Sequence, residues 1–457
     1  MKIRNVDMLS GSITKGLLLL TVPIMIMNVM QSIFTIIDMT ALEYFSSDTD
    51  VGAIGVCGTL ITLVTSLLTG VSSGANVVVA KRIGEGNKDV IGKTTMTAIL
   101  TSVVGGLLLM AVGVTFAQTF LKLTNCPDAL LPKATIYFRL YFLGVPVIMF
   151  YNFCASVLRA IGDTKKPMAF MILAGFLKVV FTVIFLIYTD MTVEGVAVAT
   201  IISQIIASAL AFITILRNND LIHLNFKKIR FYASELKEML FLGVPTGLQH
   251  SLYSLANVVI VTAVNSFGEN AATGVSIANQ FDGILYQISV APSLAVMPYV
   301  AQNAGAKNIK RVKKIIVRAI MITVMFGASF GSLSAIFSGQ LSSIMSSNPE
   351  IIAYSKQKMI IISSTYFICG INEVMGGILK GLGRPIVPTV STLLFMCLIR
   401  FPWVYFIFPL LPNLTFLYLI WPIGWILSII TQLFAYFPAI KKLQKETSKS
   451  LQTSQAI

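Results

Sequence analysis

The chain has 457 residues, of which 56% are hydrophobic and only 12% are charged, and it carries 34 Lys and Arg against 19 Asp and Glu. Soluble globular domains carry roughly 25% charged residues, so this composition excludes a water-soluble protein and predicts an integral membrane protein. The two histidines and five scattered cysteines form no zinc signature and no CxxC pair, so we expect no metal and no cofactor.

Twelve apolar runs follow one another along the chain, and about 20 apolar residues are enough to cross a bilayer as a helix. The first run contains Pro23 and is too long for a cleavable signal peptide, so it is expected to remain in the mature protein. The sequence therefore predicts an all-α polytopic membrane protein with twelve transmembrane helices and short loops. The runs lie at residues 16–39, 52–79, 94–117, 137–158, 167–188, 193–216, 239–264, 275–300, 315–337, 357–379, 386–409 and 415–438.

Basic residues lie almost entirely on one side of these runs. If the N-terminus is cytoplasmic, 27 of the 34 Lys and Arg fall in cytoplasmic segments, two fall inside spans, and five fall in external segments, namely Lys122, Lys133, Arg139, Lys356 and Lys358. Because Lys and Arg are retained on the cytoplasmic side, both termini are predicted to be cytoplasmic, in a bacterial cell membrane. The net charge of +15 is then a topology signal and a contact for membrane lipids, and no nucleic acid is expected as a partner.

The two halves of the chain repeat each other at an offset of about 221 residues, as a search for internal self-similarity shows. "VAKRIGEGNK" from Val79 aligns with "VAQNAGAKNI" from Val300, and "LRAIGDTKKP" from Leu158 aligns with "LKGLGRP" from Leu379. Because six helices are an even number, both halves insert in the same orientation, as in transporters built from parallel repeats. The expected domains are an N-terminal six-helix lobe (1–216), a cytoplasmic linker with an interfacial helix (217–237), a C-terminal six-helix lobe (238–440) and a cytoplasmic basic tail (441–457).

Four ionisable residues inside the spans are the main candidates for function. Asp38 lies in the first span, Lys178 in the fifth, Glu373 in the tenth and Arg400 in the eleventh. A charge at the centre of a bilayer costs about 2.5 to 3.5 kcal/mol on insertion scales, so such residues commonly serve ion or substrate pathways. Each also has a structural explanation, as a counter-ion within a bundle or as a side chain that extends to the headgroups.

Uncharged polar residues also gather inside the spans. Such side chains commonly bond neighbouring helices, but some line the cavities in which substrates bind. Together with Glu373 and Arg400, the candidates for a substrate cleft are Gln31, Gln249, Tyr253, Asn257 and Gln280.

The motifs and their positions resemble the multidrug and toxic compound extrusion (MATE) family, and within it the DinF-like and MepA-like bacterial branch. The likeness covers almost the whole chain and rests on "LRAIGDTKKPM" at the end of the fourth span, "GVAVATIISQ" in the sixth and "VAQNAGAKNIKR" after the eighth. The resemblance implies two six-helix lobes that rock about a central cleft. It implies an antiporter, not an enzyme, that exports bulky and often cationic drugs in exchange for H⁺ or Na⁺.

The resemblance also implies a cation site in the N-terminal lobe. Asp38 matches the acidic residue of the family's first helix, Thr200 matches its sixth-helix Thr, and Asn152 lies close to another polar position of the site. Lys178 and Thr182 stand where the family usually has Asn and Asp. These two departures make the site more positive and therefore favour H⁺ over Na⁺ as the coupling ion, since a carboxylate inside a bundle can titrate near physiological pH.

A lone ammonium inside a span is costly, so Lys178 needs an explanation. One prediction is an ion pair with Asp38, the nearest available carboxylate of the N-terminal lobe, in which Lys178 stands in for bound sodium. The alternative is that Lys178 extends to the outer headgroups or faces a wet cavity without a partner.

Two other functions remain open from the sequence. The cations Lys178 and Arg400 are also compatible with a flippase for lipid-linked oligosaccharides from the same superfamily. A membrane-embedded acyl- or glycosyltransferase would need a His, Asp or Ser constellation, which neither His223 nor His250 has in the sequence. The expected partners are small organic substrates and membrane lipids, and the protein is expected to act as a monomer.

Overall fold

Helices form the regular structure of the computed structural model, which describes residues 6–189, 191–217, 222, 224 and 229–455 and has no strand within them. The first half contains α1 (Ile13–Phe45), α2 (Asp48–Glu85), α3 (Lys88–Leu123), α4 (Leu131–Ala160), α5 (Lys165–Tyr188) and α6 (Val193–Arg217). The second half contains α7 (Ala233–Asn265), α8 (Glu269–Gly305), α9 (Ile309–Ile336), α10 (Ser338–Met345), α11 (Pro349–Ser364), α12 (Tyr366–Gly381), α13 (Ile386–Thr392), α14 (Arg400–Pro402), α15 (Leu414–Tyr418) and α16 (Ile420–Gln455).

The apolar helices agree with the spans expected from the sequence. Among the described residues, ten helical segments are long and apolar enough to cross a membrane, and α11 and α12 meet the same criterion together, although they are bent by 47°. The expected span 239–264 lies on α7, whose side chains are only partly described. The all-α, multi-pass architecture is therefore confirmed.

Two connecting segments add detail to the sequence analysis. Residues 218–221, 223 and 225–228 of the linker 217–237 lie outside the described residues, its residues 229–232 are not helical, and its last five residues form the start of α7. The eight-residue helix α10 lies between the ninth and tenth spans, where the sequence indicated only an external loop.

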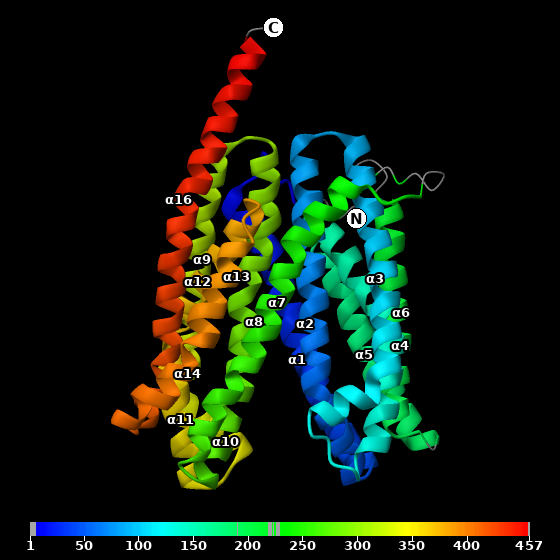
Figure 1. Cartoon of the computed structure of the whole chain (residues 1–457), viewed down its shortest axis with the longest axis vertical. Helices are drawn as coiled ribbons and strands as arrows, with labels where there is room; N and C mark the ends of the chain where they lie inside the picture. Colours follow the sequence, from blue (N-terminus) through cyan, green and yellow to red (C-terminus); the bar gives the residue numbers. More distant parts are fainter. Residues whose placement is uncertain (1–5, 190, 218–221, 223, 225–228, 456–457) are drawn as a thin grey trace. The chain divides into compact units, whose positions relative to one another are not determined.

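The chain folds as two compact units. Unit 1 contains Val6 and residues 26–247, and unit 2 contains residues 7–25 and 248–457. In unit 1, α2, α3 and α6 pack against α4, and α5 packs against α6. In unit 2, α8, α9 and α12 pack against one another and α16 packs against α12 (Figure 1).

Each unit includes a short segment from the other half of the sequence. The start of α7 belongs to unit 1, where Glu235 accepts hydrogen bonds from Arg82 of α2. The segment before α1 belongs to unit 2, where the carbonyl of Met8 accepts a hydrogen bond from Asn303 of α8 at 3.0 Å. Arg82 and Asn303 align with each other in the internal repeat. Equivalent positions of the two halves therefore form the hydrogen bonds to the start of α7 and to the segment before α1.

The internal repeat is also visible in the backbone. Gly86 after α2 and Lys307 after α8 both have positive φ angles, of 78° and 54°, and each precedes an Asn side chain that caps the next helix. Gly162 and Gly383, which are the fifth residues of the next motif in each half, have φ angles of 86° and 77°. The two members of each pair align with each other in the repeat, so the two halves use the same turns.

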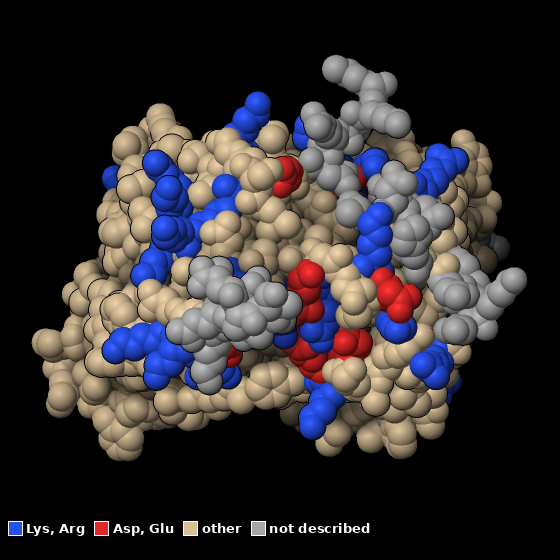
Figure 2. Space-filling model, turned by 90° about the horizontal axis from the view of Figure 1, so that it is seen from above, with Lys and Arg blue, Asp and Glu red and all other residues tan. Residues whose placement is uncertain are grey.

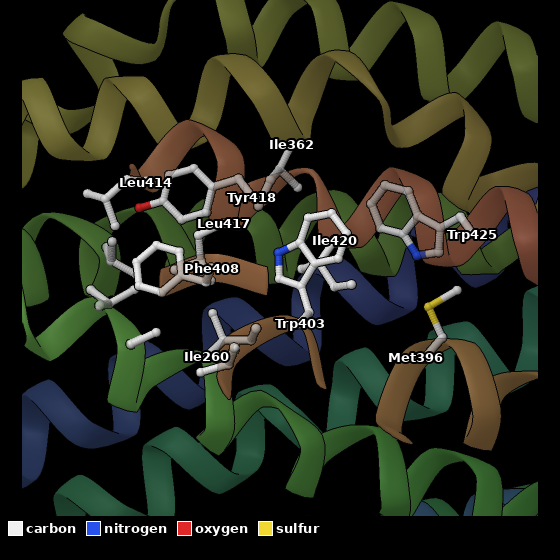
Figure 3. Close-up of a cluster of buried hydrophobic side chains, with 14 of the residues drawn as sticks. Ile260, Ile362, Met396, Trp403, Phe408, Leu414, Leu417, Tyr418, Ile420 and Trp425 are labelled. Atoms are coloured by element: carbon white, nitrogen blue, oxygen red, sulfur yellow. The ribbon is translucent and has the colours of Figure 1, made fainter. Parts of the chain in front are cut away.

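The segment that carries Arg400 is irregular. α14 lies between two π-helical turns, Leu393–Leu398 and Trp403–Ile407. Pro402 lacks an N–H group and cannot complete the regular helical hydrogen-bond pattern, which accounts for the wider turns beside it. This segment packs into a buried apolar cluster that includes Trp403, Phe408, Tyr418 and Trp425 (Figure 3).

Candidate ion-coupling and substrate sites

Asp38 and Lys178 form an ion pair between α1 and α5 of unit 1. Asp38 is buried, with 5% of its surface exposed, and its Oδ2 atom contacts the Lys178 Nζ atom. The Lys178 side chain keeps a quarter of its surface exposed. The predicted pairing is confirmed, and the alternative in which Lys178 has no partner is wrong for this structure.

A glycine on α5 and a phenylalanine on α1 allow the two helices to approach closely enough for this contact. A Cβ atom on Gly175 would lie 2.1 Å from the ring of Phe34, so only a glycine leaves room for that ring. Phe34 precedes Asp38 by four residues and Gly175 precedes Lys178 by three, so both pairs lie on the facing sides of α1 and α5. The close approach of α1 and α5 at Gly175 therefore allows Asp38 and Lys178 to meet about one helical turn further along the two helices.

The other predicted residues of the cation site differ in their surroundings. Thr182 is fully buried one turn beyond Lys178, and its hydroxyl has no hydrogen-bond partner among the described residues. The Asn152 amide donates to the Ile148 carbonyl and the Thr200 hydroxyl donates to the Val196 carbonyl, each at 2.9 Å within its own helix. The structure thus brings together Asp38 and Lys178, while Asn152 and Thr200 bond to their own helix backbones.

The predicted cleft residues lie in several places. In unit 2, Gln249 donates to the Thr392 hydroxyl at 2.9 Å and lines a small pocket with Glu373. Gln31 in unit 1 and Gln280 in unit 2 are exposed. The side chain of Tyr253 lies outside the described residues.

Arg400 is a buried residue with a polar partner on α7. Only 1% of its surface is exposed, and its Nη1 atom donates to Asn257 Oδ1 at 2.6 Å. Its guanidinium also lies over the ring of Trp421, with Cζ 5.1 Å from the ring centre. Two of the predicted cleft residues, Asn257 and Arg400, therefore do meet.

A second buried ion pair in unit 2 was missed from the sequence. Lys358 Nζ lies 2.9 Å from Asp282 Oδ2 and also contacts Asn279 Oδ1. Lys358, which we expected in an external segment, lies within α11 with 2% of its surface exposed. The sequence does contain one indication of this ion pair, because Asp282 is a carboxylate inside the apolar run 275–300 and needs a partner there.

This ion pair lies in the wall of a cavity of about 260 Å³ inside unit 2. The cavity is lined from α7 by Asn257, from α8 by Asp282 and from α11 by Lys358. Aromatic side chains complete much of the wall, including Tyr366, whose hydroxyl donates to the Asp282 carbonyl at 2.9 Å, and Trp421.

Comparisons with known proteins agree with this architecture. The chain matches the MatE family model over residues 23–184 and 245–406, two segments of equal length whose spacing is that of the internal repeat. It is 27% identical over 398 residues to "Probable multidrug resistance protein YpnP" of Bacillus subtilis (strain 168), a match that covers 87% of this chain and 88% of that protein. It is 22% identical to "Multidrug export protein MepA" of Staphylococcus saprophyticus, over 84% of this chain and 85% of that protein.

The fold also matches solved structures. One, described as an outward-facing conformation of a multidrug resistance MATE family transporter of the MOP superfamily, superimposes with a TM-score of 0.87 at 18% identity and covers 97% of this chain and 100% of that chain. Members of this family are membrane transporters that bind small molecules, and they are not enzymes. Since the family model covers more than half of the residues, the chain belongs to the MatE family, the multidrug and toxic compound extrusion transporters.

Proposed function

We propose that this transporter is a proton-coupled antiporter that exports amphipathic or cationic drugs and other toxic organic compounds across the bacterial cell membrane. The names of the relatives YpnP and MepA support multidrug export. The single observation that supports proton coupling is the ion pair between Asp38 and Lys178, because its carboxylate is a group that a proton can neutralise inside the membrane.

The ion pair connects the charge of Asp38 to the packing of two helices. An ionised Asp38 attracts Lys178 and holds α1 against α5. Protonation of Asp38 removes this attraction and leaves the ammonium of Lys178 without its counter-ion, which favours a different arrangement of the two helices. If the substrate prefers the other arrangement, proton and substrate lower each other's affinity, and the proton gradient drives export.

Sodium fits this site less well than a proton. A Na⁺ ion attracts several oxygen ligands and negative charge, whereas Lys178 Nζ already contacts the Asp38 carboxylate. Thr182 adds a neutral hydroxyl on α5 and no second negative charge. A proton on Asp38 needs no ligands beyond the carboxylate itself.

The proposed orientation has both termini in the cytoplasm. It is supported by the 27 basic residues that fall on one side of the expected spans. Lys and Arg side chains gather on the face drawn in Figure 2, and such a face suits contact with anionic lipids. We expect the transporter to act as a monomer, because the proposed coupling pair lies within unit 1 of a single chain.

A whole-cell experiment tests export and coupling together. Cells that express the transporter should accumulate less ethidium, a fluorescent cation, than cells with the empty vector. Collapse of the pH gradient at constant sodium should restore accumulation, and replacement of sodium by potassium at constant pH should have no effect. Export that stops when sodium is withdrawn would contradict proton coupling. Equal accumulation with and without the transporter, for ethidium and for a panel of amphipathic drugs, would contradict drug export.

A further inference from the structure

The helix α9 of unit 2 presents an apolar stripe that ends in a pair of lysines. Val317, Met321 and Met325 are about half exposed, and their spacing of four residues places them on one face of the helix. Lys310 and Lys314 lie on the same face nearer the start of the helix, and both are exposed. On a multi-pass membrane protein, such a stripe suits contact with acyl chains, and lysines at its end suit contact with headgroups.

The end of α16 has the same pattern. Phe434 and Phe437 are 76% and 60% exposed. Lys441 and Lys445 follow on the same face of the helix and are also exposed. On the opposite face Leu443 is buried, so this part of α16 packs against the protein. A second lysine pair therefore follows a second apolar stripe.

The two lysine pairs lie at the same end of unit 2. α16 packs against α9 along its length (Figure 1). The Thr447 hydroxyl of α16 lies 3.4 Å from the Lys307 carbonyl oxygen, which belongs to the turn before α9. The start of α9 and the end of α16 are therefore neighbours. Figure 2 looks onto this end of the helices, where Lys and Arg side chains gather.

These neighbouring helix ends carry far more positive than negative charge. Residues 306–318 and 438–448 contain seven lysines and a single carboxylate, Glu446. Within the described part of the chain, only Lys442 of these seven forms an ion pair, with Glu446 at 3.8 Å. A negatively charged ligand would supply the counter-charge that the other lysines lack.

The internal repeat shows that the fold does not require this basic surface. At the offset of 221 residues, Asp89 near the start of α3 stands where unit 2 has Lys310. Lys93, the equivalent of Lys314, pairs with Asp89 at 2.8 Å. Positive charge also directs membrane insertion, but that effect depends on the number of basic residues and not on the helix face that carries them. The alignment of the lysines with the apolar stripes therefore needs another explanation.

From the aligned stripes, the neighbouring helix ends and the missing negative charge, we infer that α9 and α16 form a binding site for a phospholipid with two phosphate groups, such as cardiolipin. One phosphate binds Lys310 and Lys314, and the other binds Lys441 and Lys445, through charge-assisted hydrogen bonds. The acyl chains pack along the apolar stripes. The inference requires only that the chain spans a membrane, and it does not rest on proton coupling or on the exported compounds.

A phospholipid with one phosphate fits the site less well. Its headgroup would satisfy one lysine pair and leave the other without a counter-charge. Two separate lipids could occupy both pairs, but each would lose its own translational freedom. When the two phosphates belong to one molecule, binding at the first pair brings the second phosphate close to the other pair, so both contacts form at the cost of immobilising one lipid.

Native mass spectrometry of the purified full-length transporter tests the inference without any ion gradient. The protein is titrated in detergent at constant ionic strength with cardiolipin, phosphatidylglycerol or phosphatidylcholine, all with the same acyl chains. The masses of the complexes count the bound lipids. We expect the first cardiolipin to bind with a Kd about tenfold lower than that of phosphatidylglycerol, and phosphatidylcholine to bind more weakly than either.

Variants locate the site on the two helices. The double variant Lys310→Gln with Lys314→Gln, and the double variant Lys441→Gln with Lys445→Gln, should each raise the Kd for cardiolipin about tenfold. The corresponding Lys→Arg double variants should raise it less than about threefold, because arginine keeps the charge and donates readily to phosphate. Thermal unfolding in detergent without added lipid checks that each variant is folded.

Unit 1 provides the matched control. Lys88→Gln with Lys93→Gln removes two positive charges at the corresponding turn of the other half, and it should leave the Kd for cardiolipin unchanged. An equal loss of affinity in this control would overturn the inference, since it would indicate attraction to net charge alone.

Further outcomes would also overturn the inference. One is an equal Kd for cardiolipin and phosphatidylglycerol, and another is cardiolipin binding that neither unit 2 double Gln variant weakens. Asp38→Asn should bind cardiolipin as the wild type does, while it loses gradient-driven export. A failure of the proposed function is therefore distinguishable from a failure of the lipid site.

Discussion

Lys178 and Arg400 each join the fifth apolar segment of their half of the chain to the first. Lys178 reaches from α5 to Asp38 on α1, and Arg400 reaches from α14 to Asn257 on α7. In each half, a cation of the fifth apolar segment thus reaches a polar side chain of the first. What differs is the partner, which is a carboxylate in unit 1 and an amide in unit 2.

This difference separates the two units chemically. A carboxylate exchanges a proton and an amide does not, so the Asp38 pair is able to respond to pH, whereas the contact between Arg400 and Asn257 keeps its charge at all physiological pH values. We therefore expect proton coupling to depend on unit 1.

The first prediction concerns Asp38. Asp38→Asn removes the exchangeable charge but keeps a side chain of nearly the same size, so we expect normal expression and substrate binding but loss of gradient-driven efflux. Efflux of a fluorescent cation from preloaded cells measures the effect.

Asp163→Asn is the matched control for this experiment. Asp163 is also buried in unit 1 and pairs with Lys166 at 2.9 Å, but this pair joins the turn before α5 to the first residues of α5 and, among the described residues, bridges no two helices. The variant should export normally if it folds. Full efflux by Asp38→Asn would remove Asp38 from the mechanism.

The multi-pass fold is predictable because its signals are local. Long apolar runs, basic loops and turns with repeated glycines act within short stretches of chain, so the spans and the repeat can be read without knowledge of contacts. The pairing of Asp38 with Lys178 is predictable for a related reason. An ammonium inside an apolar span needs a carboxylate, and the spans of the N-terminal lobe offer few.

The second ion pair depends on packing that the sequence does not display. Lys358 stands at the edge of the apolar run 357–379, where an external position is equally consistent with the pattern. It is buried because α11 packs against α8, and that contact joins residues far apart in the chain. The pocket beside it is also a tertiary feature, since several helices contribute to its wall.

The second prediction tests the orientation of the chain. A cysteine in place of Asp220 should be protected from impermeant thiol reagents in intact cells, and a cysteine in place of Asp48 should be labelled. The five native cysteines are buried, and burial raises the pKa of the Cys126 thiol in the loop between α3 and α4, so its reactive thiolate is scarce at neutral pH and background labelling should be low. Equal labelling of the two introduced cysteines would contradict the predicted topology.

The third prediction concerns the buried ion pairs that hold the start of α7 in unit 1. Glu235 accepts hydrogen bonds from Arg82 at 3.0 Å and from Thr94 at 2.8 Å, and it is almost fully buried. Glu235→Gln replaces charge-assisted hydrogen bonds with weaker ones, so we expect a loss of about 2 kcal/mol of unfolding free energy. A lower Tm of the purified protein is the readout.

An exposed ion pair provides the comparison for Glu235. Lys442 and Glu446 lie 3.8 Å apart on α16, and both side chains are more than half exposed. Exposed pairs of this kind contribute little, so Glu446→Gln should leave the Tm unchanged. Equal Tm values for the two variants would show that the buried cluster does not stabilise the fold.

The last prediction uses the repeated turn in which Gly86 and Lys307 occupy equivalent positions. Both residues have positive φ angles, which glycine adopts freely and a residue with a Cβ atom adopts only at a cost. A Cβ atom at Gly86 would meet no other group within 4 Å, so the backbone angle alone decides the effect there. Lys307→Gly should therefore stabilise the protein and Gly86→Lys should destabilise it, each by about 1 kcal/mol. Thermal unfolding of both variants, with the wild type alongside, measures the opposite shifts. If both variants shift the Tm in the same direction, side-chain contacts rather than the left-handed backbone determine the stability of this turn.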